Sequence, residues 1–219
     1  MATAKKISVH VSTTLGSVSA LIRESVNPKA VMTLAHGAGA GMTHSFMESM
    51  AEELAANAIT TIRFNFPFTE NAKKRPDPPA IAEKTVDAIL HKAHELYPAL
   101  PLVAAGKSFG GRMTSQRLAR DCPSFVKGIT FFGFPLHAAG APSVERAKHL
   151  SSITIPMLFL QGTKDTLAQI KLVEKIKKKL STASLVKFDG ADHSFKVSKK
   201  VLTGELARAV SQWIDFELK

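Results

Sequence analysis

The sequence predicts an α/β fold in which a mostly parallel, twisted sheet opens with an antiparallel hairpin, carries helices on both faces and lacks a cap domain. Short apolar runs alternate with amphipathic segments along the chain, an order typical of parallel sheets. The runs at residues 102–105 and 126–132 are almost continuously apolar, as expected where helices cover both faces of a strand. No internal repeat, low-complexity tract or long linker interrupts the pattern, so we expect one domain over residues 1–219.

The strands are predicted from short apolar or alternating runs that end in turn residues. Residues 6–12 and 17–24 form the antiparallel opening pair, because Gly16 between them suits a turn. We expect the remaining strands at residues 30–35, 59–64, 102–105, 126–132, 155–160 and 185–188. Nothing longer than residues 135–150 separates the sixth and seventh strands, which leaves no room for a lid domain.

The helices are predicted where apolar residues recur every three or four positions. Ser45 followed by Glu48 resembles a capping box at the start of the first helix, and Asp77 before Pro78 suits the start of the second. The apolar stripes of the expected helices comprise Phe46, Met47, Met50 and Leu54; Ile81, Val86, Ile89 and Leu90; Met113 and Leu118; Leu167, Ile170, Val173, Ile176 and Leu180; and Leu202, Leu206, Val210, Trp213 and Ile214.

The composition is that of a globular protein. Hydrophobic residues make up 45% and charged residues 21% of the 219 residues, which excludes a disordered or fibrous chain. The longest apolar runs fall far short of the roughly 20 residues that a membrane helix needs. The stretch at residues 1–6 is not followed by the apolar segment of a secretory signal, and the single cysteine, Cys122, cannot close an internal disulfide. We therefore expect a cytoplasmic protein with no membrane partner.

An excess of 29 basic over 18 acidic residues gives the chain a formal net charge of +11, which can attract nucleic acid or other anions. The densest lysine cluster, at residues 171–179, is interrupted by apolar residues at helical spacing, so it is typical of the solvated face of a helix. No aromatic residues that could stack on bases lie between these lysines. We therefore expect no nucleic-acid partner.

The most informative segment is residues 106–111, Gly-Lys-Ser-Phe-Gly-Gly, which follows an apolar strand and leads into a helix. It contains the pattern G-x-S-x-G. A serine on such a tight, strained strand-to-helix turn projects its hydroxyl clear of the sheet. The residues two before and two after it must be very small, and Gly106 and Gly110 satisfy this requirement. The pattern therefore predicts Ser108 as a nucleophile.

The tripeptide at residues 106–108 is also the end of a nucleotide-binding P-loop. That motif needs a glycine five residues before Gly106, where this chain has Pro101. The residues between them are strand-like and leave no glycine-rich loop that could hold phosphates. Phosphate-dependent nucleotide chemistry is therefore disfavoured.

A nucleophilic serine needs a base and a carboxylate that orients the base, and in this architecture the acid and then the histidine follow the serine. Asp165 comes just after the apolar strand at 155–160, and His193 is the only histidine beyond it. One helix and one strand fit between them, so we expect both at neighbouring strand ends. Asp189 and Asp192 are alternative acids, and the less favoured interpretation of Asp165 is an ordinary loop or N-cap residue.

Six stretches carry a family resemblance, and they occur in the expected order over nearly the whole chain. They are residues 36–41 (HGAGAG), 63–67 (RFNFP), 106–112 (GKSFGGR), 134–137 (FPLH), 156–165 (PMLFLQGTKD) and 190–193 (GADH). The chain resembles the α/β-hydrolase superfamily, and within it the small cap-less group of predicted hydrolases that are similar to dienelactone hydrolase. The hydrolase-like third subunit of a chromatin acetyltransferase complex is related to that group.

The resemblance implies the α/β-hydrolase fold and a serine hydrolase of the carboxylesterase type. Ser108 would attack the substrate, His193 would act as base and then as acid, and Asp165 would orient the imidazole. Backbone N–H groups of Phe109 and of Ala38 or Gly39 would form the oxyanion hole. No metal and no organic cofactor is implied. The related chromatin subunit serves mainly in assembly, so the alternative is a non-catalytic interaction module that retains the fold.

We expect a partly apolar pocket at the loops that follow the strands. Phe66, Phe68, Phe134 and His137 occupy such loops and are predicted to bind the substrate, a small-molecule ester or thioester. His36, Lys107 and Arg112 are expected to brace neighbouring loops. The sequence indicates no particular oligomeric state.

Overall fold

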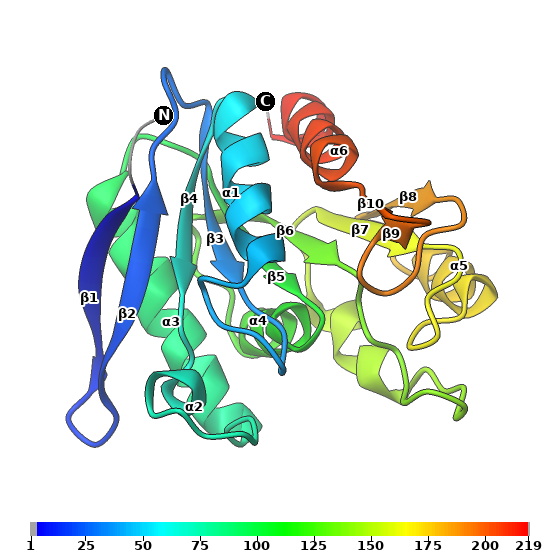
Figure 1. Ribbon diagram of the computed structural model, residues 1–219, viewed down its shortest axis with the longest axis horizontal. Helices are drawn as coiled ribbons and strands as arrows, with labels where there is room; N and C mark the ends of the chain where they lie inside the picture. The colour runs from blue at the N-terminus through cyan, green and yellow to red at the C-terminus, as the bar shows by residue number, and fades with distance from the viewer. Residues whose placement is uncertain (1–3, 219) are drawn as a thin grey trace.

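The computed structural model describes residues 4–218. Lys219 and the first three residues, which belong to the stretch for which no secretory signal is predicted, lie outside the described residues. Within residues 4–218, eight strands form one sheet in the order β1-β2-β4-β3-β5-β6-β7-β8 (Figure 1). β2 pairs antiparallel with both β1 and β4, and the other neighbours pair in parallel. The predicted mostly parallel sheet with an antiparallel opening hairpin is confirmed.

The strands of the sheet are β1 (Lys5–Ser12), β2 (Gly16–Arg23), β3 (Ala30–Ala35), β4 (Ile59–Phe64), β5 (Leu102–Lys107), β6 (Val126–Phe132), β7 (Met157–Gly162) and β8 (Ala183–Phe188). A separate two-stranded ribbon consists of β9 (Lys196–Val197) and β10 (Lys200–Val201). The helices are α1 (Ser45–Ala56), α2 (Pro67–Glu70), α3 (Pro79–Leu96), α4 (Phe109–Arg120), α5 (Ile170–Lys177), α6 (Thr203–Glu217) and the 3₁₀ helix η1 (Glu145–Ser152).

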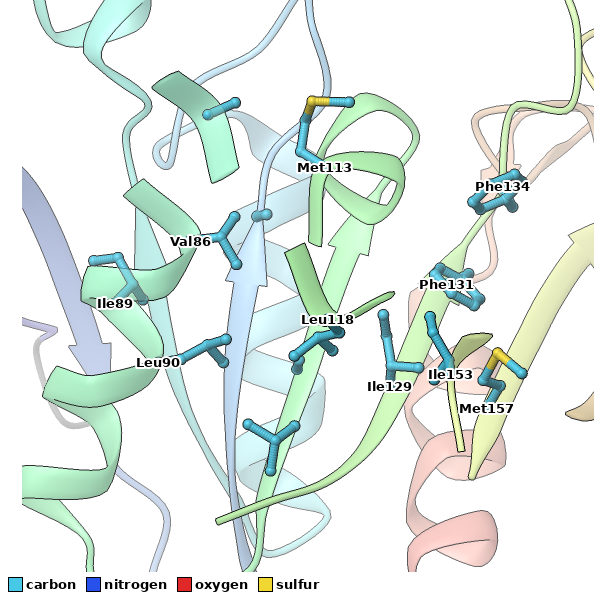
Figure 2. Close-up of a cluster of buried hydrophobic side chains, with 14 of the residues drawn as sticks. Val86, Ile89, Leu90, Met113, Leu118, Ile129, Phe131, Phe134, Ile153 and Met157 are labelled. Atoms are coloured by element: carbon cyan, nitrogen blue, oxygen red, sulfur yellow. The ribbon is translucent and has the colours of Figure 1, made fainter. Parts of the chain in front are cut away.

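Helices cover both faces of the sheet, as predicted. Successive residues of a strand point to opposite faces, so Val103 and Ala104 of β5 belong to two different buried clusters. The cluster that contains Val103 includes Trp213 of α6 and residues of α1, whereas the cluster that contains Ala104 includes Val86 of α3 and Leu118 of α4. Figure 2 shows side chains of α3 and α4 filling the space beside the sheet on this second face.

Three short elements were not expected from the sequence. The one-turn helix α2 begins at Pro67, a residue that suits the first helical position, but four residues are too few for a periodic pattern. The β9–β10 ribbon pairs only two residues from each strand. The third element, η1, lies between β6 and β7, and no cap domain is inserted within residues 133–156.

Among residues 4–218, no helix combines the length and apolar character needed to cross a membrane.

The parallel strands bring four distant segments to one edge of the sheet. His36 directly follows β3, Ser108 directly follows β5, Asp165 lies in the loop after β7 and His193 lies in the loop after β8. Because the carboxyl ends of parallel strands meet at the same edge, these four residues lie at one edge of the sheet although they come from separate parts of the sequence. β7 and β8 are neighbours, as the spacing of Asp165 and His193 predicted.

Gly128 in β6 lies so close to Trp213 that a Cβ at this position would come within 2.6 Å of the indole Cη2. We expect Gly128→Ala to displace the indole and α6 and to lower the free energy of unfolding by about 1–3 kcal/mol, the usual cost of overpacking. Urea unfolding followed by fluorescence measures this, because Trp213 is the only tryptophan in the sequence. Gly39→Ala is the matched control, since nothing lies within 4 Å of a Cβ there. Equal stabilities of the two variants would contradict the prediction.

Candidate active site

Ser108 lies on the sharp turn between the end of β5 and the start of α4. Its φ of 52° and ψ of −115° are unusual for a residue with a side chain, and such strain costs on the order of 1–3 kcal/mol. A Cβ at position 106 would come 2.3 Å from the nitrogen of Gly111, and a Cβ at position 110 would come 2.5 Å from the carbonyl oxygen of Ala35. The close approach of the backbone therefore requires glycine at both positions, and the turn has the form that the G-x-S-x-G pattern predicts.

Three side chains form a continuous hydrogen-bonded chain at this edge of the sheet. The Oγ of Ser108 lies 2.8 Å from Nε2 of His193, and Nδ1 of His193 lies 2.7 Å from Oδ2 of Asp165. The Asp165 side chain is fully buried and also accepts hydrogen bonds from the Leu167 N–H and the Gln161 amide. An ionised carboxylate can only accept, so Nδ1 of His193 carries the proton and Nε2 presents its lone pair to Ser108.

The loops that carry Asp165 and His193 are tied to each other. The Lys164 N–H donates to the Ala191 carbonyl over 2.9 Å, and the Gly190 N–H donates to Oγ1 of Thr163 over 2.8 Å. Gly162 at the end of β7 is covered by the same loop, since a Cβ there would come 2.3 Å from the Ala191 oxygen. These backbone contacts hold the imidazole against the carboxylate.

The alternative acids have other partners. Asp189 accepts a hydrogen bond from the Thr163 hydroxyl over 3.1 Å. Asp192 accepts from the backbone N–H groups of Ser194 and Lys196, which closes a turn within its own loop. Of the three candidate acids, Asp165 is the one whose carboxylate contacts the His193 ring.

A family model described as an alpha/beta hydrolase domain matches residues 28–216 of the chain. The chain belongs to the alpha/beta hydrolase family. The cap-less architecture described above is typical of the part of the superfamily that the sequence resembles.

Solved structures with this fold align over nearly the whole alpha/beta hydrolase. An alpha-beta serine hydrolase homologue from Coxiella burnetii is 18% identical, with a TM-score of 0.78 over 97% of this chain and 98% of that chain. A serine hydrolase without a lid from Xanthomonas campestris is 18% identical, with a TM-score of 0.75 over 98% and 95% of the two chains. A dienelactone hydrolase from Anabaena variabilis is 18% identical, with a TM-score of 0.76 over 100% of both chains.

The loop after β3 lies directly beside Ser108 in this alpha/beta hydrolase. A Cβ at position 37 would lie 3.8 Å from Cβ of Ser108, and Ala38 and Gly39 line the same cavity as the serine. No acceptor among residues 4–218 takes the backbone N–H of Ala38, Gly39 or Phe109. The three predicted oxyanion donors are therefore without a protein acceptor in this part of the chain, and two of them belong to residues that line the cavity.

Buried side chains hold this loop in place. The imidazole of His36 is fully buried; its Nε2 accepts the Phe66 N–H over 3.2 Å, and its Nδ1 lies 2.8 Å from the Gly37 carbonyl oxygen, to which it donates. Burial lowers the pKa of His36 from 6.5 to about 4, so the ring is neutral. The expectation that His36 braces a loop is confirmed.

A second set of hydrogen bonds holds the loop after β3, and it was not predicted from the sequence. The Met42 N–H donates to Oδ1 of Asn65 over 2.9 Å, and the Met42 carbonyl accepts from Nη1 of Arg63 over 3.0 Å. Arg63 is almost fully buried, and burial lowers the pKa of its guanidinium. Arg63 is the one charged residue of β4 (Ile-Thr-Thr-Ile-Arg-Phe), and this was the available signal, since a buried arginine needs a local polar partner.

The predicted substrate-binding residues occupy other places, which corrects that expectation. Phe66, Phe68, Phe134 and His137 are all buried, and none of them lines the cavity beside Ser108. The phenylalanines pack on one another and on neighbouring aromatic rings, and Nε2 of His137 accepts the N–H of Gln169. Their positions after strands placed them at the correct edge of the sheet, but spacing alone does not say which way a loop side chain points.

The cavity beside Ser108 has a volume of about 630 Å³. Its walls come from the loop after β3, the start of α1, the turn between β5 and α4 that carries Ser108 (the elbow), the loop after β7 and the segment that carries the β9–β10 ribbon. Its apolar side chains include Phe46, Met47, Leu167 and Val201. Val201 was missed because the ribbon itself was not predicted.

Within residues 4–218, no cluster of three or more histidine, cysteine or acidic side chains could hold a metal ion.

The buried neutral His36 predicts a pH dependence of stability. In the unfolded chain this imidazole takes up a proton near its ordinary pKa of 6.5, but in the folded protein only near about 4. Between these values the unfolded state binds more protons, so the free energy of unfolding decreases as the pH is lowered from 6.5 to about 4, by up to about 1.4 kcal/mol per pH unit from this residue. Urea unfolding of His36→Gln should show a shallower decline of the free energy of unfolding as the pH is lowered over this range.

Two features make this comparison specific. The pKa of His149 is also lowered to about 4, chiefly by burial, but His149 is present in both proteins and its contribution cancels. His10→Gln removes an exposed imidazole and serves as the control. Parallel stability curves for the wild type and His36→Gln would show that His36 is not held neutral.

Proposed function

We propose that this alpha/beta hydrolase is a serine hydrolase that cleaves carboxylic esters or thioesters through an acyl-enzyme on Ser108. One observation carries the proposal: the hydrogen-bonded chain from Asp165 through His193 to Ser108 opens into a cavity. A nucleophile, a base with its lone pair aimed at the nucleophile and a buried acid that fixes the base are the parts that acyl transfer needs.

In the acylation step, Oγ of Ser108 attacks the carbonyl carbon of the substrate while Nε2 of His193 takes the hydroxyl proton. The imidazolium that forms is stabilised by the Asp165 carboxylate on its other side. The negative charge that develops on the substrate oxygen is met by the N–H groups of Phe109 and Ala38, with Gly39 as the alternative to Ala38. Losing one such donor typically costs about 2.7–4 kcal/mol of transition-state stabilisation.

Breakdown of the tetrahedral intermediate breaks the bond to the leaving alcohol or thiol, which receives the proton from His193. The acyl group then remains on Ser108. In the second half-reaction His193 takes a proton from water as the water oxygen attacks the acyl carbon. The bond between the acyl carbon and Oγ of Ser108 then breaks, His193 returns the proton to Oγ, and the acid product leaves. The protein's own groups supply every proton transfer and every oxyanion contact, so the proposed mechanism invokes no metal and no organic cofactor.

The cavity supports a small-molecule substrate. Its volume of about 630 Å³ lies in the range of ordinary ligand pockets, and its walls combine apolar side chains with small hydroxyl residues such as Ser45, Ser49 and Thr203. Two of the structural neighbours named above are described as a serine hydrolase or a serine hydrolase homologue, which supports the same type of enzyme here. The cavity lining includes no carboxylate, so an acidic acyl group would not be repelled there and a neutral one would fit equally well.

Hydrolysis of a panel of short-chain nitrophenyl esters and thioesters tests the proposal. We expect measurable turnover by the wild type, none above background by Ser108→Ala, and a loss of about 10⁴-fold in kcat for Asp165→Asn, which would misorient the imidazole. Asp189→Asn is the matched control, because Asp189 is an exposed carboxylate that does not contact His193. Turnover that survives in Ser108→Ala would contradict the proposed mechanism. Uniform inertness of the folded wild type would favour the non-catalytic interaction module.

A further inference from the structure

Lys107, the last residue of β5, extends its side chain to the loop that carries His193. Its Nζ donates a hydrogen bond to the backbone carbonyl oxygen of His193 over 2.6 Å. The ammonium also lies 5.9 Å from the ring centre of Phe46 and 5.6 Å from that of Phe195, within the range of cation–π contacts. Lys107, which directly precedes Ser108, therefore holds the backbone of His193, the candidate base.

The ammonium also lies within about 7 Å of the imidazole. Both groups face Gly133: a Cβ built on this glycine would be 3.4 Å from Nζ of Lys107 and 3.5 Å from Cε1 and Nδ1 of His193. Lys107 forms no ion pair with any carboxylate of residues 4–218. Burial lowers its pKa to about 8, against the longer-range attraction of Asp165 and Asp192. At neutral pH the group is therefore a cation with only a carbonyl and two aromatic faces as near partners.

We propose that Lys107 is a positioning residue that fixes the backbone of His193 and, by its positive charge, disfavours protonation of the imidazole in the resting enzyme. The proposal rests on the proposed function, in which only the neutral imidazole can act as the base. A second positive charge beside Lys107 is opposed because the site is partly buried and poorly screened. The expectation that Lys107 braces a loop is thereby extended to an electrostatic effect on the base.

Several groups act on the His193 ring from the elements packed around it. The Asp165 carboxylate contacts Nδ1 and favours the charged ring, and the Ser108 hydroxyl contacts Nε2. Asp192 precedes the ring in its own loop, and His44 lines the same cavity from the loop after β3. Lys107 is the cation among these groups that touches the His193 residue, so its removal should shift the balance toward Asp165 and the protonated ring.

The pKa of His193 is measured directly from the NMR titration of its Cε1 proton, assigned by comparison with His193→Gln. We expect Lys107→Met to raise this pKa by about 0.5–1 unit, because the opposing charge is gone while the chain length is kept. Lys107→Arg keeps the charge and should stay close to the wild type. In activity, the acid limb of the kcat/KM profile should move to higher pH in Lys107→Met by the same amount as the titration, because the base is then protonated more easily.

Lys164→Met is the matched control, because it removes an exposed lysine that directly precedes Asp165, and we expect it to leave the His193 titration unchanged. If Lys107→Met does not fold, Lys107→Gln is measured in its place, with amide spectra confirming the fold. A uniform loss of activity at every pH with an unshifted His193 titration would overturn the electrostatic role. The titration requires no turnover, so an enzyme inert toward esters would refute the proposed function and still test this inference.

Discussion

The buried carboxylate of Asp165 is the group on which the geometry of the site depends. Its side chain has no exposure to solvent, and a buried charge is tolerated only where hydrogen bonds satisfy it. Leu167, Gln161 and His193 supply those bonds. The first two shape the loop after β7, and the third joins that loop to the loop after β8. The same carboxylate therefore sets the path of the chain, the tautomer of the imidazole and the direction in which its lone pair points.

The remaining parts of the site follow from how closely the backbone packs at the edge of the sheet. The elbow places Ser108 in a strained conformation, which persists only because its surroundings allow no other. The loop after β3 meets the elbow from the opposite side and is held by His36, Arg63 and Asn65. The proposed nucleophile, oxyanion donors and base thus follow different strands, yet each is held by buried contacts before any ligand arrives.

The sequence could predict those features whose chemistry restricts both the residue type and its position. A serine flanked by glycines after an apolar strand specifies an elbow, and an acid and a histidine after later strands specify its partners. The mostly parallel sheet and its opening hairpin followed from apolar runs in the same way. Side-chain direction in loops has no comparable restriction, which is why Phe66 and Phe134 were expected in the pocket but lie in the core. The ribbon that carries Val201 was missed because pairing of two residues leaves no periodic pattern.

Reaction with a fluorophosphonate probe, followed by peptide mapping with mass spectrometry, tests most directly whether these converging side chains activate Ser108. The account predicts a single phosphonylated residue, Ser108, with labelling abolished in Ser108→Ala and strongly slowed in His193→Ala. Modification of a different residue, or an unlabelled wild-type protein that is demonstrably folded, would contradict it.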